Sequence, residues 1–462
     1  MKENRSSFGS RIGFVLAAAG SAVGLGNLWR FPYLAAKYGG GIFLLVYIVL
    51  AITFGFALMI TEIAIGRKTR LSCIGAYRAL DKRFGFLGWL AALVPVIIVP
   101  YYCVIGGWVL KYFAEFIVGR GSAVAANADQ YFTSFISDSA GGFFSTPVPW
   151  FVLFALMTMA VVLGGVEKGI EKVSRIMMPV LVVLSILVAV FSLTMPGALA
   201  GLKYYLMPDF SKFSTATVLG AMGQMFYSMS LAMGIMITYG SYMQRENFME
   251  RSVAQIEIFD TGIALIAGLM IIPAVVAFNG GDPTLAQQSA GPGLMFVVLP
   301  RVFDAMQWGG FIGAAFFLLV LFAALTSSIS LMETVVSIVQ DKLHWKRVPA
   351  TLAVTVIILA LGMLSCLGYS ESFAGIQPLG MAFLDFFDFI SNSVMMPIVA
   401  FLTCILIGHV VGTKVIADEV KLENGTFRRE KLHRVMIRWV APILLLAILG
   451  GELLKFFGII KI

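Results

Sequence analysis

Long apolar segments separated by short polar stretches run through the whole 462-residue sequence, and they constrain its fold more than any other feature. A helix needs about 20 mostly apolar residues to cross the hydrocarbon core of a bilayer. With 59% hydrophobic residues, 13% charged residues and a mean hydropathy of +0.92, the composition excludes a soluble globular domain. We therefore predict an all-α membrane protein. Its eleven predicted spans lie near 12–36, 42–66, 86–110, 147–166, 176–202, 218–243, 258–279, 305–332, 348–368, 377–407 and 436–459.

The net charge of +8 comes mainly from loops between these spans, so it does not indicate a nucleic-acid partner. Most of the 33 Lys and Arg residues fall in alternate loops, with the largest groups at 67–83 and 414–438. Basic residues concentrate on the cytoplasmic side of membrane proteins. The pattern predicts a cytoplasmic N-terminus and, since the number of spans is odd, an extracellular C-terminus. No cleavable signal peptide is expected, because polar and charged residues interrupt the first apolar segment.

A glycine-rich stretch, AAAGSAVGLGNLWRFP at 17–32, interrupts the first span. Glycine allows a helix to unwind, and unwound backbone at membrane depth needs polar partners. Freed carbonyls could hold a cation, whereas the amides that open the next half-helix favour an anion such as a carboxylate. Arg30 strengthens the case for a ligand site, because an arginine within an apolar span costs about 3 kcal/mol on insertion scales. The alternative is a kinked helix whose glycines only mediate packing.

The sixth span, 218–243, contains no charge but is rich in Ser, Gly, Gln and Met around its middle, which predicts a second broken helix. Interruptions in spans one and six are typical of two five-helix repeats with inverted topology and a binding site between them. The predicted organisation is a cytoplasmic tail at 1–10, a first repeat at 11–205, a second repeat at 206–411, a cytoplasmic loop at 412–435, and an eleventh span with the extracellular C-terminus at 436–462.

Polar side chains inside other spans are further candidates for a site. Thr326, Ser327 and Ser328 lie in an apolar helix, where each hydroxyl commonly bonds back to the preceding turn. As a set facing the first break, they would suit a hard monovalent cation that needs about five or six oxygen ligands. Glu62 lies near the end of span two, where it either snorkels to the interface or braces an unwound neighbour.

Enzymatic and transition-metal chemistry find no support in the sequence. The four cysteines show no C-x-x-C spacing, and the three histidines form no cluster. No nucleophile with a neighbouring base and no phosphate-binding loop occurs in a suitable context. We therefore expect a protein that is not an enzyme.

Several motifs together resemble the neurotransmitter:sodium symporter family, and in particular its prokaryotic amino-acid transporters of the eleven-span type. They are RIGFVLAAAGSAVGLGNLWRFPYLAAKYGGGIF, TEIAIGR, the YY pair of span three, GQMFYSMSLAMG, GIMITYGSY, ALTSSIS and the two acids of span ten. The resemblance covers essentially the whole chain. It implies a LeuT fold, sodium-coupled amino-acid uptake by alternating access, and a location in the cell membrane.

The resemblance also implies two sodium sites. The first would use Ala22, Asn27, Ser228 and Asp260, together with the substrate carboxylate. The second would use the carbonyls of Gly20, Val23 and Ala323 and the hydroxyls of Thr326 and Ser327. The oxygen cluster expected from the residues alone thus coincides with the second implied site.

The implied substrate site divides into three parts. The amides of Leu25 and Gly26 and the Tyr102 hydroxyl would bind the carboxylate, and carbonyls of Ala22, Tyr227, Ser228 and Ser230 would bind the amine. Ile98, Tyr227, Met233 and Leu331 would surround the substrate side chain. An apolar pocket with a flexible thioether favours an apolar or aromatic amino acid.

Two gates follow from the same resemblance. The outer gate would pair Arg30 with Asp388 rather than Asp385, beneath Tyr102 and Tyr227. The inner gate would pair Arg5 with Asp341, supported by Ser241 and Tyr242.

Four positions depart from the family pattern. Phe8 replaces a common tryptophan, Tyr227 replaces a common phenylalanine, and Ala232 replaces a glycine of the sixth-span break. Asp260 stands where asparagine is frequent, so its carboxylate can supply negative charge itself, and we expect chloride-independent transport.

Two other functions remain open at this stage. A transporter-like amino-acid sensor would bind its ligand without turnover. A proton-coupled carrier could use the membrane carboxylates Glu62, Asp260, Asp385 and Asp388 as a relay, although hydroxyl and carbonyl ligands suit sodium better.

Overall fold

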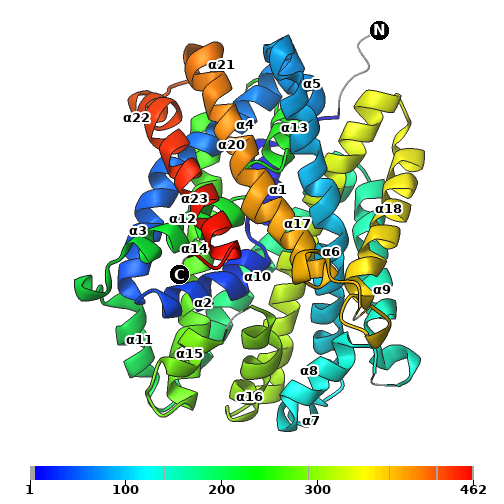
Figure 1. Cartoon of the computed structure of the whole chain (residues 1–462), viewed down its shortest axis with the longest axis vertical. Helices are drawn as coiled ribbons and strands as arrows, with labels where there is room; N and C mark the ends of the chain where they lie inside the picture. Colours follow the sequence, from blue (N-terminus) through cyan, green and yellow to red (C-terminus); the bar gives the residue numbers. More distant parts are fainter. Residues whose placement is uncertain are drawn as a thin grey trace.

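The computed structural model describes residues 6–139, 141–246, 248–289, 291–373, 375–422 and 425–459, and in these ranges the chain is a bundle of helices without β-strands (Figure 1). Eight continuous helical segments are long and apolar enough to cross a membrane. They are Gly41–Thr69, Lys82–Ile117, Val166–Leu193, Met249–Phe278, Gly309–Leu343, Arg347–Leu367, Phe383–Val410 and Glu430–Phe456.

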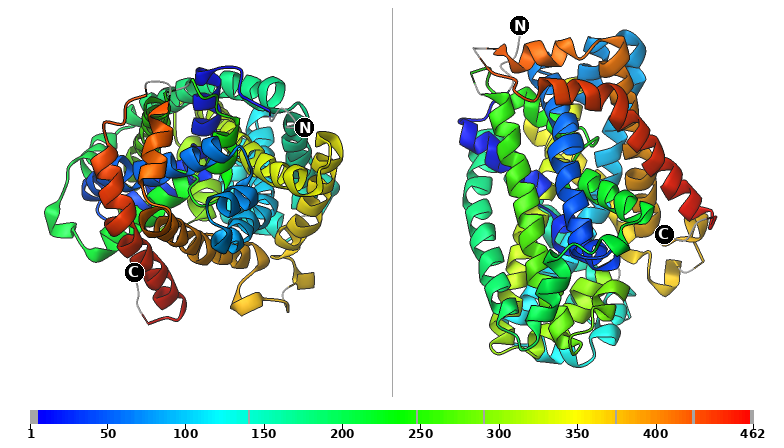
Figure 2. Two further views of the ribbon diagram at one scale, coloured as in Figure 1. Left: turned by 90° about the horizontal axis from the view of Figure 1, so that it is seen from above. Right: turned by 90° about the vertical axis from the view of Figure 1, so that its left-hand side faces the viewer.

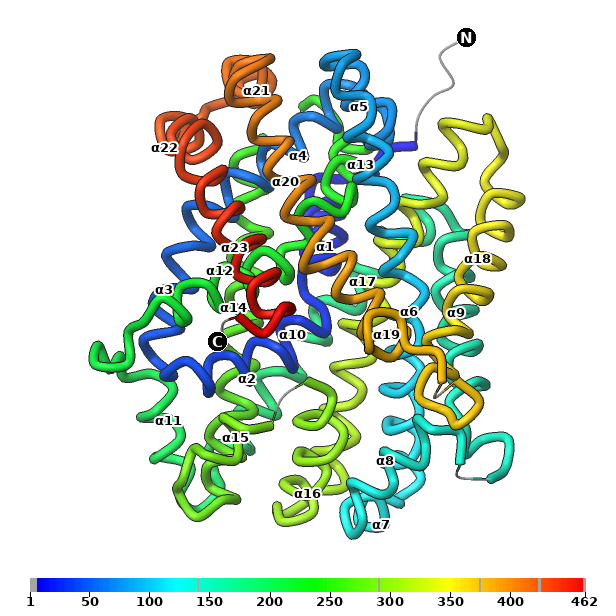
Figure 3. The backbone as a smooth tube through the Cα atoms, viewed as in Figure 1, coloured from blue at the N-terminus to red at the C-terminus, as the bar shows by residue number. Residues whose placement is uncertain are grey.

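The three remaining predicted spans are also helical but differ in form. The first consists of α1 (Arg11–Ala22) and a second half, Gly26–Lys37, that includes α2 (Phe31–Lys37), and the halves meet at a bend of 52°. The fourth is the shorter apolar helix α9 (Pro147–Leu163). The sixth is divided into α12 (Thr215–Ser228) and α13 (Ile235–Tyr242). Both helices expected to be broken are therefore broken, as the backbone tube shows for α1 and α2 (Figure 3).

The long helices carry the labels used below. They are α3 (Gly41–Leu50), α4 (Phe56–Thr69), α6 (Gly85–Ile117), α10 (Lys172–Leu193), α14 (Met249–Phe278), α17 (Gly309–Leu343), α18 (Arg347–Leu367), α19 (Phe383–Asp388), α20 (Met396–Ile405), α22 (Glu430–Val435) and α23 (Ala441–Phe456). Shorter helices in the connections are α5 (Cys73–Leu80), α7 (Gly121–Ala126), α8 (Ala128–Ile136), α11 (Ala198–Leu206), α15 (Thr284–Gln288), α16 (Leu299–Asp304) and α21 (Lys414–Val420).

Two spans begin and end at places that differ from the sequence prediction. The fifth was expected at 176–202, but its helical segment covers Val166–Leu193, and α11 follows as a separate helix. Pro196 and Gly197 lie in the turn between them, and Gly197 has a φ of +90°, which a continuous helix does not allow. The eighth was expected at 305–332, but α17 continues to Leu343. Its buried Glu333 can remain within the helix because it pairs with Arg347.

The broken helices lie in the centre of the bundle. α1 contacts α10, α14 and α17, and α13 packs mainly against α4. Seen from above, the other helices surround these segments (Figure 2). The end of the bundle that holds α5, α21, α22 and the start of α1 is called the inner end here, because the sequence predicts it to be cytoplasmic; α7, α8, α15 and α16 lie at the opposite, outer end (Figure 1).

Candidate functional site

The first break exposes backbone groups in the middle of the bundle. α1 ends at Ala22, and Val23 is extended, with φ −74° and ψ 99°. A π-helical turn from Gly26 to Arg30 then leads into α2. A Cβ atom added at Gly24 would lie 2.7 Å from Oγ of Ser327 and 2.9 Å from the hydroxyl of Tyr102. Glycine at this position therefore allows two hydroxyl groups to approach the unwound backbone.

The second break is fixed by a buried carboxylate. Between α12 and α13, Ser230, Ala232 and Gly234 have positive φ values of 53°, 59° and 71°. The Ala232 amide donates a hydrogen bond of 2.7 Å to Glu62, whose side chain is buried in α4. Of the two interpretations of Glu62 that the sequence left open, the structure selects the brace for an unwound neighbour. Ser230 also links the two breaks, because its hydroxyl donates to the Ser21 carbonyl at 2.9 Å.

A narrow cavity of about 30 Å³ lies between the two breaks. The ten residues predicted to bind substrate all line it: Ala22, Leu25, Gly26, Ile98, Tyr102, Tyr227, Ser228, Ser230, Met233 and Leu331. Ser21, Gly24, Ile235 and Ser327 complete the lining. The Leu25 amide points to the Tyr102 hydroxyl at 3.3 Å, so these two predicted carboxylate ligands are adjacent. The polar groups gather at one part of the cavity, and Ile98, Met233 and Leu331 add an apolar wall.

Asp260 joins the side chains predicted for the first sodium site. Its Oδ1 accepts a hydrogen bond of 2.7 Å from the Asn27 amide, and Oδ2 lies 3.4 Å from the hydroxyls of Ser228 and Tyr47. Asp260 and Asn27 are fully buried. Tyr47 also lies 3.0 Å from the Ser228 hydroxyl, although the sequence gave no reason to single it out within an apolar helix. The arrangement places one buried carboxylate against neutral oxygens beside the cavity.

A second group of oxygen atoms converges on Ser327 in α17. Its hydroxyl lies 3.4 Å from the Gly20 carbonyl, 3.1 Å from that of Ser21 and 3.4 Å from that of Val23. A hydroxyl carries one hydrogen and cannot satisfy three acceptors at once. Such a cluster has the chemistry that a hard cation requires. Thr326 lies on the next position and bonds to the Ala323 carbonyl at 3.1 Å, so all five residues predicted for the second sodium site lie in or beside this cluster.

The outer side of the cavity opens toward a vestibule of about 270 Å³ that contains both predicted partners of the outer gate. Arg30 donates to the Gly223 carbonyl at 3.3 Å and lies over the Tyr227 ring at 5.3 Å. Asp388 instead accepts hydrogen bonds from Tyr101 and from Asn392. In the part of the chain that the structure describes, Arg30 and Asp388 line one vestibule without forming an ion pair.

Asp385, the other acid of span ten, accepts a hydrogen bond of 3.2 Å from Tyr369. It lines the same vestibule as Asp388.

The inner side of the site is closed by side chains from α13, α17 and α18. Tyr242 donates to Glu333 at 2.8 Å, and Glu333 pairs with Arg347. Asp341 accepts from the Ser72 amide at 2.6 Å. Ser241 donates to the Thr238 carbonyl at 2.5 Å.

Arg5, the remaining member of the predicted inner gate, lies outside the described residues. The sequence analysis did not identify Glu333, although an isolated acid directly after the hydroxyl-rich stretch of span eight was a usable signal.

Comparisons with known proteins agree with this geometry. The model of the Sodium:neurotransmitter symporter family matches residues 5–120 and 123–459. The chain belongs to this family. An uncharacterized sodium-dependent transporter of Bacillus subtilis, YhdH, is 34% identical over 95% of this chain and 96% of its own length. A second, from Methanocaldococcus jannaschii, is 31% identical over 96% of this chain and 89% of its own length.

Among solved structures, the crystal structure of MhsT in complex with L-phenylalanine matches with a TM-score of 0.86 and 37% identity, covering 97% of this chain and all of that one. The protein therefore has the LeuT fold that the sequence predicted, with two inverted repeats and an eleventh span. It is a multi-pass membrane transporter and not an enzyme.

Proposed function

We propose that the protein imports apolar or aromatic amino acids together with sodium by alternating access. The observation that carries this proposal is the cavity between two broken helices, which is flanked on one side by the Asp260 group and on another by the Ser327 cluster. The match to a transporter crystallised with L-phenylalanine supports an amino-acid substrate. The family model and the names of the relatives support sodium as the coupling ion.

The substrate carboxylate would meet the amides of Leu25 and Gly26 at the start of a half-helix, where the helix dipole favours negative charge. Its amine would meet carbonyls beside Ser228 and Ser230 at the end of α12. The cavity of about 30 Å³ has room for only a few water-sized probes, so an amino acid requires the surrounding side chains to move. Met233 is suited to this role because an unbranched thioether adapts to irregular shapes.

Coupling follows from contact between the substrate and the first cation. The carboxylate would complete the shell formed by Ala22, Asn27, Ser228 and Asp260, so each ligand would raise the affinity of the other by the same factor. The buried Asp260 carboxylate supplies a fixed negative charge beside that cation. We therefore propose transport without a chloride requirement and with two sodium sites.

Closure on the outer side would bring Arg30 to Asp388 across the vestibule, above the rings of Tyr102 and Tyr227. On the inner side, Asp341 with Ser241 and Tyr242 would act with Arg5. Ion pairs at intermediate exposure contribute about 1 kcal/mol or slightly more, which is weak enough to form and break within a transport cycle. We assign residues 1–10 and 412–435 to the cytoplasm of a cell-membrane protein, with the C-terminus outside.

The test is uptake of each of the twenty amino acids by purified protein in liposomes, first with an inward sodium gradient and then with a proton gradient in sodium-free buffer. Sodium-dependent accumulation of apolar or aromatic amino acids is expected. Saturable binding without accumulation would indicate a sensor, and proton-driven uptake without sodium would indicate a proton-coupled carrier. Either result would overturn the proposal.

A further inference from the structure

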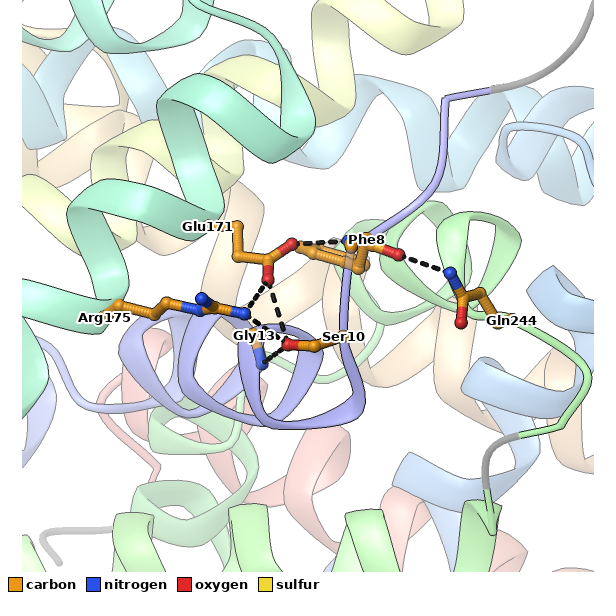
Figure 4. Close-up of polar contacts among 7 residues, drawn as sticks. Phe8, Ser10, Gly13, Glu171, Arg175 and Gln244 are labelled. Carbon is orange, nitrogen blue, oxygen red and sulfur yellow. Dashed lines mark hydrogen bonds and ion pairs between the residues drawn. The ribbon is translucent and has the colours of Figure 1, made fainter.

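The residues that precede α1 form a short strap, Phe8–Ser10, across the inner end of the bundle (Figure 4). Phe8 is fully buried, and its ring packs against Phe14 at 5.6 Å and Tyr239 at 5.5 Å between centroids. Its amide donates to the Tyr242 carbonyl at 3.2 Å, and its carbonyl accepts from Gln244 at 2.9 Å. One side of the strap is thereby attached to α13 and the residues that follow it.

Glu171 holds the other side of the strap. This carboxylate accepts hydrogen bonds from the Gly9 amide at 2.7 Å, the Ser10 hydroxyl at 3.0 Å and Arg175 at 2.6 Å (Figure 4). Its side chain is 3% exposed, whereas that of Arg175 is 49% exposed. Ser10 in turn accepts from Arg175 at 2.5 Å and from the Gly13 amide at 2.9 Å, so it caps the start of α1.

The first turn of α1 is shaped to receive this carboxylate. A Cβ atom added at Gly13 would lie 1.9 Å from Oε1 of Glu171, a distance that no side chain could tolerate without displacement. Glycine at this position allows the helix and the carboxylate to pack directly against each other. Glu171 belongs to the π-helical segment Val166–Glu171 that begins the fifth span, so the contact joins the first span to the fifth.

The contact acts selectively on one arrangement of α1. If the start of α1 leaves the fifth span, Glu171 loses the Gly9 and Ser10 donors and keeps only Arg175. A buried carboxylate that loses its donors is strongly destabilised, because hydrogen bonds to charged groups compensate for lost hydration. The carbonyl of Gly20, three turns farther along the same helix, belongs to the oxygen cluster around Ser327. The position of the strap therefore determines the position of that carbonyl.

We propose that Glu171 is a positioning residue for transport, which sets the balance between the inner-closed arrangement seen here and an inner-open one. This inference rests on the proposed function, since it assumes that α1 moves during transport. Glu171 lies across the strap from Tyr242 and Asp341, so it is separate from the predicted inner gate. It holds the strap through a carboxylate on the fifth span, where the gate would hold it through the sixth and eighth.

The test measures access to the inner side directly and does not require transport. Ala18 is fully buried in α1, one turn before Ser21, and so faces the same side as the pocket. In an Ala18→Cys background, the rate of modification by a small water-soluble thiol reagent reports the inner-open fraction. The four native cysteines are buried and provide a low background. Glu171→Gln is expected to accelerate modification about five- to thirty-fold, because it removes the charge from two hydrogen bonds.

The matched control is Glu167→Gln, which removes the same charge from the same segment. Glu167 is exposed and lies near Gly9, so it shares the electrostatic surroundings without being buried against α1. Modification in this variant is expected to proceed at the parental rate. An equal acceleration in both variants, or none in Glu171→Gln, would overturn the proposal.

Sodium distinguishes a shifted equilibrium from local damage. Saturating sodium is expected to slow modification in Glu171→Gln, with its midpoint raised by the same factor as the inner-open fraction. Fast modification at every sodium concentration, where the parent responds to sodium, would indicate a disrupted helix and overturn the proposal. If Glu171→Gln does not fold, Ser10→Ala removes one donor and is expected to accelerate modification less; an unchanged rate there would overturn it. Absence of uptake with this labelling pattern intact would reject only the proposed function.

Discussion

Replacing Gly24 by alanine should weaken sodium and substrate binding together. The added methyl group would lie 2.7 Å from Oγ of Ser327 and 2.9 Å from the hydroxyl of Tyr102, well inside van der Waals contact. Neither neighbour can move freely. Ser327 is held among three carbonyls, and Tyr102 accepts from the Leu25 amide.

The magnitude follows from the cost of overpacking a closely packed site, about 1–3 kcal/mol. Applied to binding, this range corresponds to a loss of affinity of about five- to 150-fold, because 1.4 kcal/mol corresponds to about a factor of ten. Since one methyl group displaces a member of the cation cluster and a carboxylate ligand, we expect the sodium midpoint and the substrate Kd to rise in the same variant. Equilibrium binding of radiolabelled amino acid, titrated with sodium and separately with substrate, measures both.

Gly262→Ala is the control for this experiment. Gly262 lies within α14, and a Cβ atom there meets nothing within 4 Å. This variant should bind as the parent does and should not lose stability, because alanine favours a helix over glycine by about 1 kcal/mol. Unchanged affinities in Gly24→Ala would refute the close approach that we describe, and a loss confined to substrate would remove Ser327 from the argument.

Three further predictions concern the ion clusters and the vestibule. Wild-type uptake should be unchanged when chloride is replaced by gluconate, whereas Asp260→Asn should reduce uptake at least tenfold and recover part of it with added chloride; a chloride requirement in the wild type would refute this reasoning. Ser327→Ala should raise the sodium midpoint about tenfold by removing a ligand and the close partner of three carbonyls, while Ser328→Ala, whose hydroxyl bonds to Thr158 instead, should leave it nearly unchanged. Asp388→Asn should abolish uptake and Asp385→Asn should reduce it mildly, as measured in liposomes; the reverse order would assign the outer gate to Asp385.

The sequence predicted the features that depend on local chemistry. Hydropathy located the spans, because each must supply its own apolar surface to the bilayer. Glycine spacing located the first break, and the absence of charge with abundant small residues located the second. The hydroxyls of span eight were also identified before their partners were known, since polar groups within an apolar helix are conspicuous.

Features that depend on how helices pack could not be predicted in the same way. Glu171 lies among basic residues of an inner loop and has the composition of a solvated segment, yet it is buried against α1. Tyr47 is one aromatic residue in an apolar helix until α3 is placed beside Asp260. The actual contacts of Arg30, a carbonyl of α12 and the Tyr227 ring, likewise arise from the angle between helices.

Ala232 gives the two breaks unequal conformational freedom. An alanine with a φ of +59° occupies a small allowed region of backbone space, whereas a glycine could sample several. Its amide is also tied to Glu62 on α4, the helix against which α13 packs. The loss of backbone entropy at this junction is thus already complete in the folded protein, so the second break behaves as a rigid corner. Rotation between half-helices is then concentrated at the first break, where Gly24 and Gly26 leave the torsion angles free to change.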